Sequence, residues 1–183
     1  HWDMANHLTN SLVYADHYQA ILDSRTFGPL AKAADNFFVR ENTYYPPLAY
    51  WISVPFILSL GRTFTAAVAS NAVFLIIFVF AIYGIGRHLW NRTTALLGVV
   101  AAVSFPFIIG QFHEFQLDMP LTAMTAAALW GLLQTKRWQK PGWSLAFGAI
   151  AGAAMLTKWE LPAFMLGPVV YELIGRIREI RQS

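Results

Sequence analysis

Charged residues are scarce in this chain. Asp, Glu, Lys and Arg together make up 13% of its 183 residues, whereas hydrophobic residues make up 56%. Soluble domains usually carry about 25% charged residues. A surface with half that fraction must largely face lipid. The composition therefore excludes a soluble globular domain and predicts an integral membrane protein.

Cysteine is absent, which excludes thiolate metal sites. The sequence also lacks a P-loop, a Rossmann fingerprint, a Ser-His-Asp pattern and a paired-His zinc motif. The net charge is +3, but the basic residues occur in short clusters between apolar runs. This is typical of cytoplasmic loops, so no nucleic-acid partner is predicted. The chain begins at His1 without an initiator Met, and we expect further segments on both sides of it.

Apolar runs predict an all-α, polytopic transmembrane helical bundle, with residues 1–183 forming part of one transmembrane domain. A membrane span needs roughly 20 apolar residues. Residues 66–86 and 93–112 meet this length, and Pro106 should kink the second span. Shorter uncharged runs are also predicted to be spans: residues 117–133, 143–157 and 161–175. Residues 46–60 are only 15 residues long and begin with a double proline, which favours an interfacial helix.

The positive-inside rule orients these spans. Basic loops at 87–92, 134–140 and 176–183 then lie in the cytoplasm, and residues 1–45 form the first extracytoplasmic loop, with juxtamembrane helices. The expected location is a multi-pass protein of a bacterial or archaeal plasma membrane, with its active site on the extracytoplasmic face. If residues 46–60 crossed the membrane fully, residues 1–45 would join the basic side instead.

A polar face begins at Asp3. Its members recur at helical spacing, with Leu8, Leu12 and Ala15 on the other face: Asp3, His7, Asn10, Tyr14 and His17. Removing a carboxylate from water near a membrane is costly unless the carboxylate is paired with a cation or takes part in binding or catalysis. Asp3 is therefore a candidate general base or divalent-metal ligand, with His7 as a lesser candidate. The alternative is a solvated carboxylate at the start of a helix.

Further candidates lie at the outer ends of the predicted spans. Asp118 precedes Pro120 in a short turn, and either caps the next helix or joins Asp3 in an anion or metal site. Lys158 either extends to the membrane interface or contacts a lipid phosphate. Tyr45, in front of a double proline, is either part of a rigid turn with interfacial aromatics or a substrate contact.

Four stretches in these regions resemble one family. They are Trp2-Asp3-x-Ala5-Asn6-His7-Leu8, Tyr45-Pro46-Pro47-Leu48-x-Tyr50-Trp51, Leu117-Asp118-Met119-Pro120-Leu121-Thr122 and Leu156-Thr157-Lys158. The chain is similar to the family 39 / aminoarabinose-transferase-like branch of the C-type glycosyltransferases, which includes the protein O-mannosyltransferases. The likeness covers nearly the whole chain, and the four stretches occur in the same order as in the family. The resemblance implies that the chain is an N-terminal part of such an enzyme.

The resemblance implies transfer of a sugar, a hexose or a pentose, from a polyprenyl-phosphate-linked donor on the extracytoplasmic face. The acceptor is a hydroxyl of a lipid, glycan or protein. Asp3 aligns with the expected general base, and Asp118 with an acid that supports substrate or metal binding. His7, Tyr45 and Lys158 are the substrate-binding candidates.

Two positions depart from the family pattern. Many members have Glu where this chain has Met4, and some branches have an acidic or His residue where it has Tyr44-Tyr45. A divalent metal on Asp3 and Asp118 is compatible with the sequence but not required by it.

The chemistry agrees with this interpretation. Displacing a polyprenyl phosphate needs a base for the attacking hydroxyl and cations for the departing phosphate. Asp3 suits the base, whereas Lys158 and Arg62 suit the phosphate. The runner-up function is a transporter or channel subunit, but transporters place ionisable residues inside spans, and here the acids gather at the outer surface. A membrane scaffold is a third alternative, in which replacing Asp3 and Asp118 would change nothing.

Overall fold

The computed structural model describes residues 2–23 and 45–182, and within them every regular element is an α-helix. The all-α prediction is therefore confirmed for this part of the chain. Residues 24–44 of the predicted first extracytoplasmic loop, which include Tyr44, lie outside the described residues. The helices, in chain order, are α1 (Trp2–Asp23), α3 (Leu48–Leu60), α4 (Phe64–Ala69), α5 (Asn71–Leu89), α6 (Arg92–Val103), α7 (Pro106–His113), α8 (Asp118–Gln134), α9 (Pro141–Met155) and α10 (Leu161–Gln182).

Polar side chains cap the starts of α4 and α6. Thr63 Oγ1 accepts a hydrogen bond from the Ala66 amide, and α4 follows. Asn91 Oδ1 accepts from the Thr94 amide at 2.9 Å, and α6 follows. Each side chain satisfies an amide that has no partner within its own helix. These two caps give the apolar runs definite starting points.

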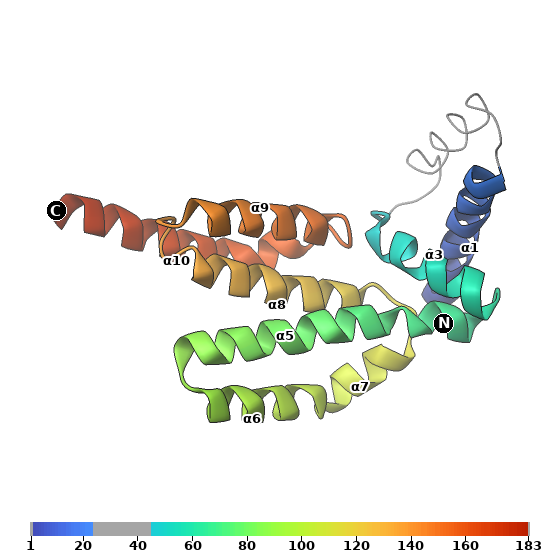
Figure 1. Cartoon of the computed structure of the whole chain (residues 1–183), viewed down its shortest axis with the longest axis horizontal. Helices are drawn as coiled ribbons and strands as arrows, with labels where there is room; N and C mark the ends of the chain where they lie inside the picture. The colour runs from blue at the N-terminus through green and yellow to red at the C-terminus, as the bar shows by residue number, and fades with distance from the viewer. Residues whose placement is uncertain (1, 24–44, 183) are drawn as a thin grey trace.

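Helix α8 lies at the centre of the bundle. It packs against α5 on one side and against α9 and α10 on the other, while α6 covers α5 (Figure 1). Small residues allow the close approach. A Cβ at Gly84 would lie 2.3 Å from Nε1 of Trp130 on α8, and one at Gly86 would lie 2.8 Å from the Ala95 Cα on α6. Side chains larger than glycine at these positions would push the helices apart.

The predicted kink at Pro106 is confirmed. Helices α6 and α7 are separate and meet at an angle of 58°. Pro106 is the first residue of α7, where its missing N–H costs nothing and its fixed φ suits a helix start. The preceding Phe105 is extended, as expected for a residue before proline.

Among the described residues, Phe64–Leu89 is the one helical segment long and apolar enough to cross a bilayer. The bent pair Arg92–Val103 and Pro106–His113 would be a second if it forms one span. Helices α8 and α9 have 17 and 15 residues. The remaining spans of the predicted polytopic bundle therefore stay a prediction, as does the interfacial position of α3.

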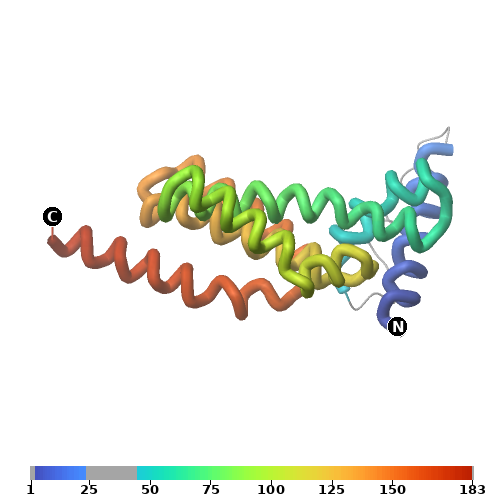
Figure 2. The backbone as a smooth tube through the Cα atoms, turned by 90° about the horizontal axis from the view of Figure 1, so that it is seen from below, coloured from blue at the N-terminus to red at the C-terminus, as the bar shows by residue number. Residues whose placement is uncertain are grey.

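Helices α1 and α3 pack together at the end of the molecule where α8 begins (Figure 1). Their contact buries the middle of the polar face of α1, because His7, Asn10 and Tyr14 are all at most 5% exposed. The Leu48 amide of α3 donates to the Leu156 carbonyl after α9 at 2.8 Å. Seen from below, α10 runs along the edge of the bundle to the other end (Figure 2). Residues from both halves of the chain thus meet at the α1–α3 end.

Candidate active site

Lys158 lies in the turn between α9 and α10, at the α1–α3 end. Thr157 before it is fully buried and donates a hydrogen bond to the Ala154 carbonyl at 2.5 Å, which fixes the turn. The Lys158 ammonium donates to Asp118 Oδ1 at 2.9 Å and lies 3.3 Å from Glu160 Oε2. Its side chain is 18% exposed. Lys158 is therefore a largely buried, paired cation, and not a side chain that extends freely to the membrane interface.

Asp118 is the first residue of α8, and Leu117 occupies the N-cap position without a side-chain cap. The capping interpretation of Asp118 is therefore wrong. Its carboxylate instead accepts a charge-assisted hydrogen bond from Lys158, a stronger interaction than one between neutral groups. This pair joins the start of α8 to the turn after α9, across forty positions of sequence. Asp118 is 39% exposed, so solvent or a substrate reaches the pair.

His7 connects α1 to α3 at this end of the molecule. Its Nδ1 and the Tyr50 hydroxyl are 2.8 Å apart in a buried hydrogen bond, and His7 is 4% exposed. The ring centroids of His7 and Tyr45 are 5.2 Å apart. Tyr50 in turn stacks on Tyr14 at 5.9 Å. Aromatic rings thus hold His7 in place from both the double-proline segment and α3.

The charges at this site act on one another. Burial has the largest effect on His7 and lowers its pKa below the usual value. The nearby cation of Lys158 lowers this pKa further, whereas the carboxylates of Asp3 and Asp118 raise it. Because the net shift is downward, His7 is neutral at pH 7. For Lys158, burial is the largest single effect and lowers the pKa. The combined hydrogen bonds and charges of Asp118 and Glu160 outweigh it, so the pKa is raised and Lys158 stays cationic.

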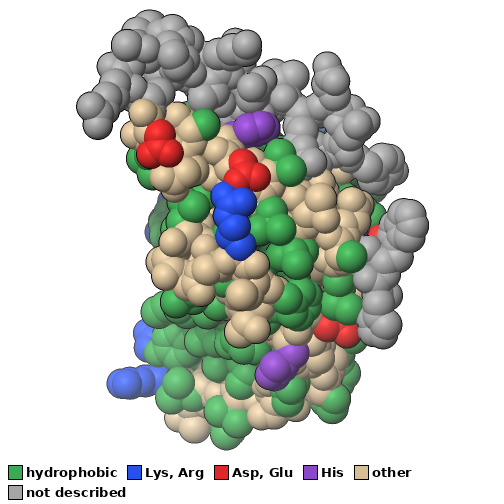
Figure 3. All heavy atoms as spheres, turned by 90° about the vertical axis from the view of Figure 1, so that its right-hand side faces the viewer, with side chains coloured by type: hydrophobic (Ala, Val, Ile, Leu, Met, Phe, Trp, Pro, Cys, Tyr) green, Lys and Arg blue, Asp and Glu red, His purple; other side chains and the backbone are tan. Residues whose placement is uncertain are grey.

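Five of the residues that the sequence singled out lie within interaction range of one another at this end: Asp3, His7, Tyr45, Asp118 and Lys158. Asp3 lies exposed in the first turn of α1 and close enough to His7 to act on its pKa, as do Asp118 and Lys158. Tyr45 packs on the same imidazole. Arg62 is different, because it pairs with Asp16 on α1. From this end, charged side chains are few and are set among hydrophobic ones (Figure 3).

Three further residues shape the site and were not singled out from the sequence. Tyr50 is the partner of His7, and Glu160 is the second partner of Lys158. Asn71, which is 1% exposed, donates from Nδ2 to the carbonyls of Glu114 at 2.9 Å and Phe112 at 3.1 Å. Asn71 thereby holds the turn that leads to Asp118. The sequence did contain a sign of this role, because Asn71 is a polar amide within the otherwise apolar run 66–86.

The donor set does not fit a divalent metal ion. The Asp118 carboxylate already accepts from an ammonium group, and a nearby cation would repel a second one. Within residues 2–23 and 45–182, no group of three or more His, Cys, Asp or Glu side chains is arranged to hold a metal. The arrangement offers instead the exposed carboxylate of Asp3, the paired cation of Lys158 and the buried imidazole of His7, within electrostatic range of one another.

Comparison with known proteins identifies one family. The family model described as dolichyl-phosphate-mannose-protein mannosyltransferase matches residues 45–183. This range includes Tyr45, Asp118 and Lys158, but not Asp3 or His7. No curated protein and no solved structure matches the chain.

Proposed function

The chain belongs to the dolichyl-phosphate-mannose-protein mannosyltransferase family, and from this we propose that it transfers a sugar from a polyprenyl-phosphate donor to an acceptor hydroxyl. Proteins of this family are membrane-integral glycosyltransferases. We place the reaction on the extracytoplasmic face, where the positive-inside rule puts the α1–α3 end. The acceptor hydroxyl belongs to a lipid, a glycan or a protein.

One observation supports this proposal most strongly. The ammonium of Lys158 is paired with Asp118, and this pair and the carboxylate of Asp3 all lie within electrostatic range of His7. A polyprenyl-phosphate sugar presents a phosphate anion next to an electrophilic carbon, and the acceptor presents a weakly acidic hydroxyl. A fixed cation suits the phosphate, and a free carboxylate suits the hydroxyl.

Asp3 is the base in the proposed reaction. Its exposed carboxylate takes the proton from the acceptor hydroxyl as the hydroxyl oxygen forms a bond to the anomeric carbon. The bond between that carbon and the phosphate oxygen breaks, and its electron pair leaves with the polyprenyl phosphate. A single attack inverts the configuration and needs no covalent intermediate. Because phosphate is a good leaving group, no protein acid is required.

Lys158 holds the departing phosphate in this scheme. Its pKa is raised on balance, so the side chain stays protonated while negative charge grows on the leaving group. Asp118 orients the ammonium through the 2.9 Å hydrogen bond. Electrostatic groups that are oriented beforehand lower a barrier without reorganising during the reaction. Tyr45 offers an aromatic contact for the sugar, whereas His7 is buried against Tyr45 and Tyr50 and acts by holding these rings in place.

A transporter is the alternative, and the position of the charges favours an enzyme. Transporters place ionisable residues near the bilayer midplane, often at broken helices. Asp118 is at the first position of α8, and Lys158 lies between α9 and α10. The charged groups of the candidate site thus lie at helix ends.

A transfer assay tests the proposal. Membrane vesicles that contain the full-length protein are given polyprenyl-phosphate mannose labelled in the sugar. We expect label in macromolecules or lipids of the vesicle, released polyprenyl phosphate in equal amount, and no label from a nucleotide-linked mannose. Matched vesicles without the protein supply the background. Label transfer that does not depend on the protein, or that uses the nucleotide sugar directly, would remove the proposed function.

A further inference from the structure

A strained turn joins α8 to α9 at the end of the bundle away from the candidate active site. Its three consecutive residues Lys136, Arg137 and Trp138 have φ values of 49°, 56° and 64°. Side chains other than glycine rarely adopt this left-handed conformation, and a run of three is unusual. Strain of this kind persists only where surrounding contacts enforce it, and it often marks a functional segment.

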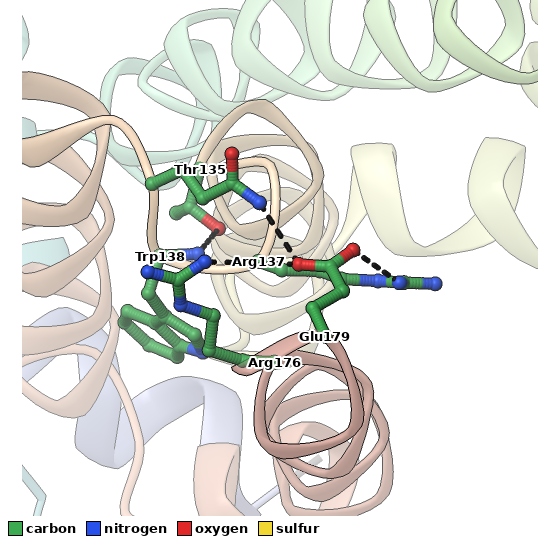
Figure 4. Close-up of polar contacts among 6 residues, drawn as sticks. Thr135, Arg137, Trp138, Arg176 and Glu179 are labelled. Carbon is green, nitrogen blue, oxygen red and sulfur yellow. Dashed lines mark hydrogen bonds and ion pairs between the residues drawn. The ribbon is translucent and has the colours of Figure 1, made fainter. Parts of the chain in front are cut away.

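Thr135 enforces the turn. It is fully buried, its hydroxyl donates to the Leu132 carbonyl at 2.7 Å, and the same oxygen accepts from the Trp138 amide at 3.2 Å. The Lys140 amide closes the turn onto the Thr135 carbonyl at 3.0 Å. The result is that the Arg137 side chain is directed onto α10 (Figure 4).

Arg137 crosses α10 at Gly175. A Cβ at Gly175 would lie 2.8 Å from Arg137 Nε, so a larger residue there would displace the Arg137 side chain. Beyond it, Arg137 Nη1 donates to Glu179 Oε1 at 2.5 Å, while Gln139 Nε2 donates to Glu179 Oε2 at 2.9 Å. Figure 4 shows Glu179 between the turn and Arg176, whose guanidinium is 3.7 Å from the carboxylate. The guanidinium of Arg137 is therefore held in a defined position.

A pocket of about 400 Å³ opens beside Arg137. Its polar wall includes Arg178 and Gln182, and its apolar wall is formed by Tyr171 and Ile174. Among the residues that the structure describes, Arg178 has no carboxylate partner. Glu179 is the acidic residue that lines the pocket, and its carboxylate already accepts a hydrogen bond from Arg137. The pocket therefore carries an excess of positive charge.

The pocket also changes from apolar to basic along α10. Tyr171, Ile174, Arg178 and Gln182 recur at intervals of three or four residues, so they share one face of the helix. Tyr171 and Ile174 are 69% and 46% exposed, although both are large and hydrophobic. A soluble anion would use only the basic half of this face. A phospholipid has a charged phosphate joined directly to apolar chains, and the protein resides in a membrane.

We propose that this pocket binds an anionic phospholipid. The phosphate lies between Arg137 and Arg178, and the first part of the acyl chains lies against Tyr171 and Ile174. Arginine suits this role because its guanidinium pairs with two phosphate oxygens at once. The strained turn and Gly175 together place Arg137 over the pocket. The site is separate from the proposed transfer site, and its occupation does not depend on the transfer reaction.

Lipid binding to the purified full-length protein tests this proposal by native mass spectrometry, with phosphatidylglycerol and phosphatidylcholine as probes. We expect phosphatidylglycerol to bind more tightly. Arg178→Gln should weaken its binding about fivefold, the factor that corresponds to ~1 kcal/mol per basic residue at a membrane surface. Arg92→Gln is the matched control, because Arg92 is exposed at the start of α6 and does not line this pocket. It should leave binding unchanged.

Three results would overturn the proposal: equal binding of the two lipids, equal effects of Arg178→Gln and Arg92→Gln, or displacement of phosphatidylglycerol by inorganic phosphate at the same concentration. The last would make this a site for soluble anions. Arg178→Gln removes no observed ion pair within the described residues, so the thermal unfolding midpoint should stay constant. This separates a binding effect from a folding effect.

Discussion

Replacing Asp3 with Asn should lower the rate of sugar transfer by about a hundredfold or more, as loss of a general base does. Asparagine has nearly the same shape but cannot accept the proton of the acceptor hydroxyl. Asp3 is exposed, so the thermal unfolding midpoint should not change. Donor binding should also persist, because the phosphate is assigned to Lys158. The measurement is kcat for transfer from polyprenyl-phosphate mannose, together with the donor Kd.

Asp23→Asn is the matched control for this variant. Asp23 is another exposed carboxylate of α1, at the far end of the helix, and accepts hydrogen bonds from Gln19. Its replacement should leave transfer within about twofold of wild type, as expected for a surface substitution away from the site. If Asp3→Asn and Asp23→Asn are equally active, Asp3 is not the base.

Asp118→Asn should lower transfer by about a hundredfold, the usual cost of removing one oriented electrostatic group from an active site. The neutral amide no longer orients Lys158 or supports its charge. Stability should change little, by about 1 kcal/mol or less, because the pair is partly solvated and Glu160 remains near the ammonium. Activity and the unfolding midpoint, measured on the same preparation, separate the two effects.

Glu160 offers a sharp control for Asp118, because both carboxylates contact the same ammonium. Glu160 is the more exposed and more distant partner, at 57% and 3.3 Å against 39% and 2.9 Å for Asp118. Glu160→Gln should therefore keep most of the activity. Lys158→Met should be as impaired as Asp118→Asn, and the double variant should be little worse than either. Fully additive losses would show that Asp118 acts independently of Lys158.

The helices of this fold could be predicted from local properties. Uncharged runs gave the ends of α8 and α9 to within two residues, and Pro106 gave the break between α6 and α7. The run 66–86 was predicted as one span, and the break between α4 and α5 near Ser70 was not predicted. Helix α10 continues to Gln182, beyond the predicted end at 175, because the basic residues that end an apolar run do not end a helix. Hydropathy reports the environment of a segment, whereas helix ends depend on caps and on residues such as Gly and Pro.

The members of the candidate site could also be predicted, but their partners could not. Spacing on α1 marked Asp3 and His7, and a turn between predicted spans marked Asp118. The pairing of Asp118 with Lys158 depends on how α8 and α9 pack, which no local pattern encodes. The left-handed turn at Lys136 is a similar case, because none of its three residues is Gly or Asn. Contacts with Thr135 and α10 override the local preference there.

The most direct measurement is to locate the donor phosphate on the protein. Polyprenyl-phosphate mannose with a photoreactive group on its first isoprene unit is bound to the full-length protein, irradiated, and the labelled peptide is sequenced. The account predicts label at residues 156–160, around Lys158, and loss of that label on competition with unmodified donor. Label confined to residues 135–140 or 171–182, at the basic pocket of α10, would contradict it and place the donor at the other end of the bundle.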